Sequence, residues 1–89
     1  MGEKLDVDSA SGFRRRLGKS PLELGNTGAD NTCPEIWELD NGDIAVIGTD
    51  LTASYAGRLP SGVLISPGEK LVVIPRVTMI SAKPDIPDA

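Results

Sequence analysis

The sequence contains no histidine, and this absence removes several kinds of active site. Ser/His/Asp and Cys/His nucleophilic arrangements need an imidazole that titrates near neutral pH. The single cysteine, Cys33, excludes an intrachain disulfide and leaves no Cys/His ligand set for structural zinc. The glycines show no P-loop or G-x-G-x-x-G spacing that would cradle phosphate. We therefore expect no metal ion, no cofactor and no nucleophilic catalysis.

Aromatic residues and long apolar runs are also scarce. Phe13, Trp37 and Tyr55 are the only aromatic residues, so the core must be built mainly from Val, Ile and Leu and its stability should be modest. No apolar run approaches the roughly 18 to 20 residues that span a bilayer, and the N-terminal residues lack the apolar region of a secretory signal. With one cysteine and no sign of export, the expected compartment is the cytoplasm.

The charge that is present is mostly negative, with a net value of -4. Residues 1–32 contain five basic and five acidic side chains, whereas residues 33–89 contain four basic and eight acidic ones. An acidic surface repels phosphates and anionic lipids, so the sequence predicts neither a nucleic-acid partner nor a membrane partner.

Two short apolar runs joined by Asn41-Gly42 predict a β-hairpin over residues 36–47, because this pair tolerates the positive φ angles of a two-residue turn. A two-residue loop places Leu39 opposite Ile44 and Trp37 opposite Val46. The same register puts Trp37, Leu39, Ile44 and Val46 on one apolar face, which should be the core side. Trp37 itself fits either a core position or the centre of a binding surface.

The remaining elements follow from periodicity and from proline. Residues 50–59 predict a short helix with Leu51, Tyr55 and Leu59 on one face, and Pro60 ends it. Residues 63–65 predict a third strand, residues 66–69 a capping-box turn, and residues 70–74 a central strand that is apolar on both faces. Signals conflict over residues 76–82, and a short helix is narrowly favoured over a strand. The predicted class is a small, β-rich α+β domain of about three to five short strands and one or two helices.

The N-terminal part of the chain differs in composition from the rest. Residues 1–32 are poor in large apolar side chains and predict a disordered arm, residues 33–82 a folded domain, and residues 83–89 a flexible tail rich in Pro and Asp. Within the arm, residues 12–24 form a candidate linear motif, in which Phe13 and Leu17 are spaced as anchors of a helical turn. The candidate partner-binding residues are Phe13, Arg14, Arg15, Arg16, Leu17 and Trp37.

The carboxylates around the hairpin and the thiol of Cys33 could take part in catalysis, but a structural role is favoured for both. The carboxylates around the hairpin, Glu35, Glu38, Asp40, Asp43 and Asp50, would support acid and base catalysis only if burial separated their pKa values. Water screens the groups at the turn, which favours turn and surface roles and assigns no catalytic residue. No basic residue lies near Cys33 in the sequence to activate its thiol, so a buried structural role is favoured over reactivity.

Three segments of the chain resemble a group of small actinobacterial proteins of the streptomycete type. They are residues 33–50, Val73-Ile74-Pro75-Arg76 and Ala82-Lys83-Pro84-Asp85-Ile86. The resemblance covers most of residues 33–86. It implies a bacterial cytoplasmic protein often found beside regulatory or secondary-metabolism functions, and it transfers no active-site residue.

Three hypotheses follow. The first is a non-catalytic protein-interaction or regulatory module whose basic and apolar arm binds a protein partner. The alternative is a ribosomally synthesised precursor or accessory peptide that a modifying enzyme recognises through residues 13–24. The third, a minimal carboxylate enzyme, has the least support. Unpaired strand edges in so small a sheet also make a homodimer through a sheet edge a candidate assembly.

Overall fold

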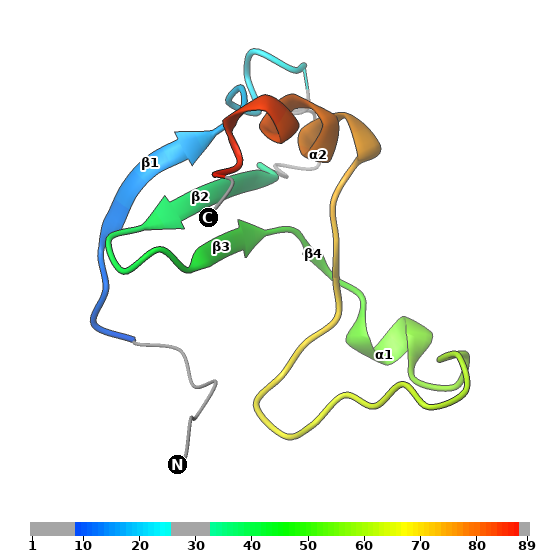
Figure 1. The fold of residues 1–89 in the computed structure, drawn as a ribbon. Coiled ribbons are helices and arrows are strands. Elements are labelled where there is room, and N and C mark those ends of the chain that lie inside the picture. The colour runs from blue at the N-terminus through cyan, green and yellow to red at the C-terminus, as the bar shows by residue number, and fades with distance from the viewer. Residues whose placement is uncertain (1–8, 26–32, 88–89) are drawn as a thin grey trace.

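The computed structural model describes residues 9–25 and 33–87. These residues form an α+β structure with strands in two antiparallel sheets and short helices, which confirms the predicted class. In chain order the elements are β1 (Phe13–Leu17), β2 (Glu35–Leu39), β3 (Ile44–Ile47), β4 (Thr49–Asp50), α1 (Thr52–Tyr55), β5 (Val72–Val73), α2 (Arg76–Ala82) and a 3-10 helix, η1 (Lys83–Asp85) (Figure 1). The first three strands form one sheet in the order β1-β2-β3, and β4 pairs with β5 in a second.

The folded part of the chain begins earlier than the sequence predicts. β1 pairs antiparallel with β2 and forms an edge of the sheet, with Arg16 opposite Trp37 and Leu17 opposite Ile36. The prediction of an unstructured arm is therefore wrong for residues 13–17, and so is the helical turn with Phe13 and Leu17 on one side. The parts of the predicted arm at residues 1–8 and 26–32 lie outside the described residues.

The predicted hairpin forms, but its register is shifted by one residue. The loop has three residues rather than two: Gly42 donates its N–H to the Leu39 carbonyl at 2.9 Å, and Leu39 donates to the Asp43 carbonyl at 2.8 Å. Gly42, at φ +92°, is the left-handed residue that ends such a loop. Trp37 consequently lies opposite Ala45 rather than Val46. Because side chains alternate along a strand, this shift separates Trp37 and Leu39 from Ile44 and Val46, so the predicted apolar face is wrong.

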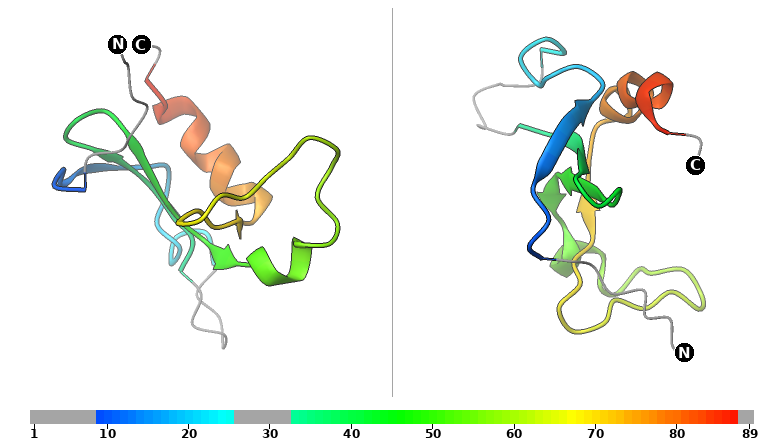
Figure 2. Two further views of the ribbon diagram at one scale, coloured as in Figure 1. Left: turned by 90° about the horizontal axis from the view of Figure 1, so that it is seen from below. Right: turned by 60° about the vertical axis from the view of Figure 1, so that its left-hand side comes forward.

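One face of the three-stranded sheet is covered by α2, and the core lies between them (Figure 2). Leu17 of β1, Ile36 of β2 and Ala82 of α2 form the buried core cluster of the described chain, with Ile74 packed against them. Gly18, at φ +84°, turns the chain after β1 where an added Cβ would lie 2.7 Å from the backbone nitrogen of Ala82. Glycine thus permits the close approach of β1 to α2 that closes this small core.

The second sheet, formed by β4 and β5, lies at the periphery, and the strands predicted at residues 63–65 and 70–74 are absent or shorter. The run of residues 70–74 contributes only β5, whose two valines are exposed, so a central strand covered on both faces is wrong. Residues 63–65 form no strand, and they lie in a long loop that extends away from the sheet (Figure 2). The predicted helix of residues 50–59 is present only as α1, one turn long. Hydrogen bonds from the hydroxyl and N–H of Thr52 lower the pKa of Asp50 at its start.

The C-terminal segment, α2 and η1, packs against the sheet and is part of the folded structure. The narrowly favoured helix over residues 76–82 is confirmed as α2, which begins after Pro75. The prediction of a flexible tail from residue 83 is wrong for η1, because Asp85 of this turn contacts β1. Its backbone carbonyl accepts a hydrogen bond from Arg15 Nη2 at 2.7 Å, and its Oδ2 accepts one from the Gly18 N–H at 2.8 Å. Residues 88–89 lie outside the described residues.

Candidate functional site

The face of the three-stranded sheet opposite α2 carries an exposed cluster of aromatic and basic side chains. We call this the open face. Arg16 and Trp37 form a cross-strand pair on it, and Phe13 and Leu39 form the next pair along the strands. Since paired residues of an antiparallel ladder share a face, the strands bring these four side chains together although 20 or more residues separate them in sequence. α1 and the loop that follows it lie beyond β4 and do not cover this face (Figure 1).

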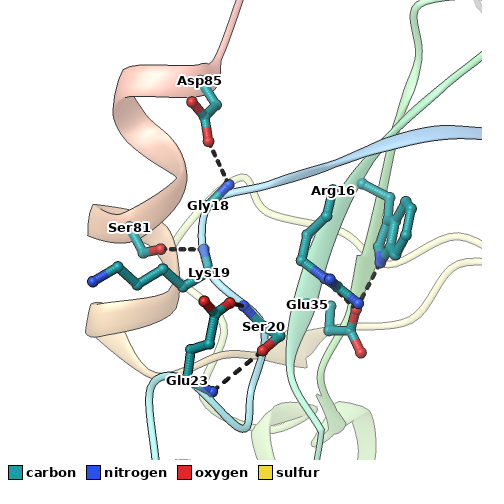
Figure 3. Close-up of polar contacts among 9 residues, drawn as sticks. Arg16, Gly18, Lys19, Ser20, Glu23, Glu35, Ser81 and Asp85 are labelled. Carbon is teal, nitrogen blue, oxygen red and sulfur yellow. Dashed lines mark hydrogen bonds and ion pairs between the residues drawn. The ribbon is translucent and has the colours of Figure 1, made fainter.

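Trp37 is the centre of the cluster and is held on three sides. The Phe13 ring meets it edge-on, with 5.4 Å between ring centroids and an interplanar angle of 63°. The Arg16 guanidinium lies 4.7 Å from the Trp37 ring centroid, within the range of a cation–π interaction. Trp37 Nε1 donates to Glu35 Oε1 at 2.7 Å, and Arg16 Nε donates to the same oxygen at 3.0 Å (Figure 3). Glu35 therefore fixes both the indole and the arginine that stacks on it.

Phe13 and Arg14 extend the cluster toward the hairpin turn. The Phe13 side chain is 64% exposed despite its contact with Trp37. Arg14, the extra residue of a β-bulge in β1, donates from Nη2 to the Asp40 carbonyl at 2.5 Å, and its side chain is about half exposed. We call the set Phe13, Arg14, Arg16 and Trp37 the aromatic-arginine surface.

The other two candidate residues lie on the opposite face of the sheet. Leu17 is 2% exposed and belongs to the core. Arg15 Nε donates to Glu38 Oε1 at 2.9 Å on the side of the sheet covered by α2. Glu38 is buried there, and the arginine supplies the hydrogen bond and the opposite charge that its carboxylate needs. The six candidate residues therefore do not form one site: four share an accessible surface, and two hold the strand to the rest of the fold.

The carboxylates around the hairpin are engaged in structural contacts. Glu35 and Glu38 each meet an arginine of β1, and the Asp43 carboxylate contacts the side-chain amide of Asn41 within the turn. Within residues 9–25 and 33–87, no group of three or more His, Cys, Asp or Glu residues is placed to hold a metal ion. Cys33 is exposed, so the predicted buried role of this thiol is wrong.

Comparison with family models, curated proteins and solved structures finds no match for this chain. The aromatic-arginine surface must therefore be interpreted from its own chemistry. In the described part of the chain, no helix has the length and apolar character needed to cross a membrane.

The loop after β1 contains a structured turn that sequence reasoning missed. The Ser20 N–H donates to Glu23 Oε1 at 2.8 Å, and the Glu23 N–H donates back to Ser20 Oγ at 3.2 Å (Figure 3). Hydrogen bonds from the backbone and then the side chain of Ser20 lower the pKa of Glu23 below its usual value. The signal was present in the sequence, because Ser20-Pro21-Leu22-Glu23 has the same capping-box pattern as residues 66–69.

Proposed function

We propose that the protein is a small, non-catalytic interaction module that binds a protein partner through the aromatic-arginine surface. The observation that carries the proposal is the exposed Phe13 ring standing edge-on to Trp37 on the sheet face that α2 leaves open. Exposed aromatic side chains flanked by arginine are typical of the centres of protein interfaces, because they bury a large area at a small entropic cost.

The contacts of this surface favour a preorganised site. Trp37 and Arg16 share one carboxylate oxygen of Glu35, so neither side chain has to be ordered when a partner binds. Partner binding would then cover the Phe13 ring and the free edge of Trp37. In the arm hypothesis the binding residues lie in an unstructured segment that folds on the partner. Here they lie on β1 and β2 of the sheet before the partner binds.

The test is affinity capture from the native host with the full-length protein and two matched variants. Phe13→Asp places a charge at the exposed tip of the surface and should abolish partner capture. Leu64→Asp changes a side chain that is 84% exposed in the distant loop and should leave capture unchanged. Capture of the same partner by wild type and Phe13→Asp would refute the proposal, provided that both show the same Trp37 emission spectrum. An intact mass from the host that shows cleavage or dehydration would instead favour the precursor alternative.

We also propose that two copies associate through the outer edge of β3. In the described residues, β2 is the only strand paired with β3, whose four residues are all uncharged. β1, the other edge, would place arginines opposite arginines in an antiparallel pair, which is unfavourable. Sedimentation velocity should show a dimer that Val46→Lys dissociates, and a monomer at high concentration would contradict this assembly.

The proposed location is the cytoplasm, where a single free thiol stays reduced. Cell fractionation with an antibody against the protein would test it, and recovery from the culture medium would contradict it.

A further inference from the structure

A second surface lies on the side of the molecule that carries α2. A groove of about 490 Å³ runs between α2 and the loop that follows β1. Its lining residues are Gly18, Lys19, Leu24, Val77, Ile80, Ser81, Pro84 and Asp85. This volume is within the range of about 300 to 1,000 Å³ typical of ligand and peptide pockets.

The groove is apolar along α2. Val77, Ile80 and Pro84 follow one another at the i, i+3 and i+7 spacing of a single helical stripe, and Leu24 faces them from the loop. Ile80 is 58% exposed, although the opposite side of the same helix, at Thr78 and Ala82, is buried against the sheet. The helix therefore has one side packed against the core and a second, apolar side that no described residue covers.

The groove is also preformed. Gly18 and Lys19 on one wall are bound to the other wall through their backbones: the Lys19 N–H donates to Ser81 Oγ at 2.6 Å, and the Gly18 N–H donates to Asp85 Oδ2 at 2.8 Å (Figure 3). The hydroxyl and the carboxylate that line the groove are thus used to hold its two walls together.

Three cationic side chains lie in or beside the groove: Lys19, Arg76 and Lys83. Lys19 lines it, and Arg76 and Lys83 lie at positions i−4 and i+3 from Ile80 on the helix. Among the described residues, none of these three makes an ion pair, whereas all three arginines of β1 do. Two carboxylates stand against them: Asp85 in the lining, and Glu23, whose charge interacts with that of Lys19. The balance is one net positive charge beside exposed apolar side chains, in a chain whose net charge is -4.

We infer that this groove binds an acidic, apolar segment of a protein partner. Apolar side chains of the segment fill the space between Leu24, Val77 and Ile80, and its carboxylates meet the cations at the rim. The site lies on the opposite side of the sheet from the aromatic-arginine surface and does not depend on it. A membrane surface fits less well, because α2 has only seven residues and the whole chain is acidic.

The test uses the full-length protein and a fluorescein-labelled synthetic peptide, ELDELLDELDEL, followed by fluorescence anisotropy. The acidic peptide should bind, and a matched peptide with lysine at every acidic position should not. Ile80→Glu and the triple variant Lys19→Glu, Arg76→Glu, Lys83→Glu should each weaken binding at least about tenfold. Binding should also weaken as salt is raised, because the contacts at the rim are exposed.

Two control variants separate the groove from general effects of charge and from the other surface. Lys70→Glu changes an exposed cation outside the groove and Phe13→Asp changes the aromatic-arginine surface, so both should bind the acidic peptide as wild type does. Equal binding of the two peptides, an equal loss in Lys70→Glu, or no binding at all would overturn the inference. Binding to phosphatidylglycerol vesicles that the acidic peptide does not displace would also overturn it in favour of a lipid surface.

Discussion

Leu17→Ala is the substitution that best separates a strand at residues 13–17 from an unstructured arm. Leu17 is 2% exposed and packs with Ile36 and Ala82 in the core of the described chain. Truncating a buried leucine to alanine costs about 2 to 5 kcal/mol, and the loss of one of so few core side chains leads us to expect about 3 kcal/mol. A single small core supplies about 3 to 5 kcal/mol in total, so the variant should be largely unfolded or close to its midpoint in buffer.

The assay is urea unfolding followed by the fluorescence of Trp37, the only tryptophan, which lies on the neighbouring strand. Leu22→Ala is the matched control, because this leucine lies in the same N-terminal segment but is 77% exposed. Its unfolding free energy should stay within about 0.5 kcal/mol of wild type. If Leu17→Ala is as stable as Leu22→Ala, Leu17 is not in the core and the strand assignment fails.

Three further predictions test local features. Gly18→Ala should cost about 2 kcal/mol or more, since a left-handed alanine is strained and its Cβ would lie 2.6 Å from Ser81 Oγ; unchanged urea unfolding would contradict this close approach. Glu23 should titrate by NMR below 4.5, because hydrogen bonds from Ser20 lower its pKa. These bonds therefore stabilise the turn fully above pH 4.5 and are lost as the pH falls through the lowered pKa, whereas a midpoint at or above 4.5 would mean that the capping box is absent. Cys33 should react with a thiol reagent in native buffer as fast as in urea, and protection in buffer would contradict its exposure.

The sequence predicted elements whose signals are local. The hairpin, the turn at residues 66–69 and the helix that begins after Pro75 depend on neighbouring residues, and all three are present. The register of the hairpin failed because Asn41-Gly42 is compatible with both a two-residue turn and a three-residue loop that ends in a bulge. A difference of one loop residue moves every side chain of β3 to the other face.

The strand β1 could not be found from local periodicity, because its partner residues lie 19 to 26 positions further along the chain. Three consecutive arginines resemble a solvated segment when they are considered alone. They become strand residues because Glu38 lies opposite Arg15 and binds it, and because Glu35 of the same neighbouring strand binds Arg16. Strand preference depends on cross-strand neighbours more than on the strand's own residues, which is why the apolar run at residues 70–74 was overestimated and β1 was missed.

The sequence predicts which residues form the aromatic-arginine surface but not which of them are in contact. The sequence indicates Phe13, Arg14, Arg16 and Trp37 as candidates, yet nothing in it predicts that the Phe13 and Trp37 rings touch. The i, i+4 spacing of Phe13 and Leu17 predicts that they share one side of a helical turn, whereas in a strand with a bulge at Arg14 the two side chains point to opposite faces.

The most direct test of the pairing of β1 with β2 and of the surface on it is the NMR spectrum of the full-length protein at residues 13–17 and at Trp37. We expect strand-type chemical shifts for β1 and nuclear Overhauser effects between the Phe13 and Trp37 rings, whose centroids lie 5.4 Å apart. Random-coil shifts for residues 13–17, with no contact between the two rings, would contradict both the sheet and the aromatic-arginine surface proposed to bind a partner.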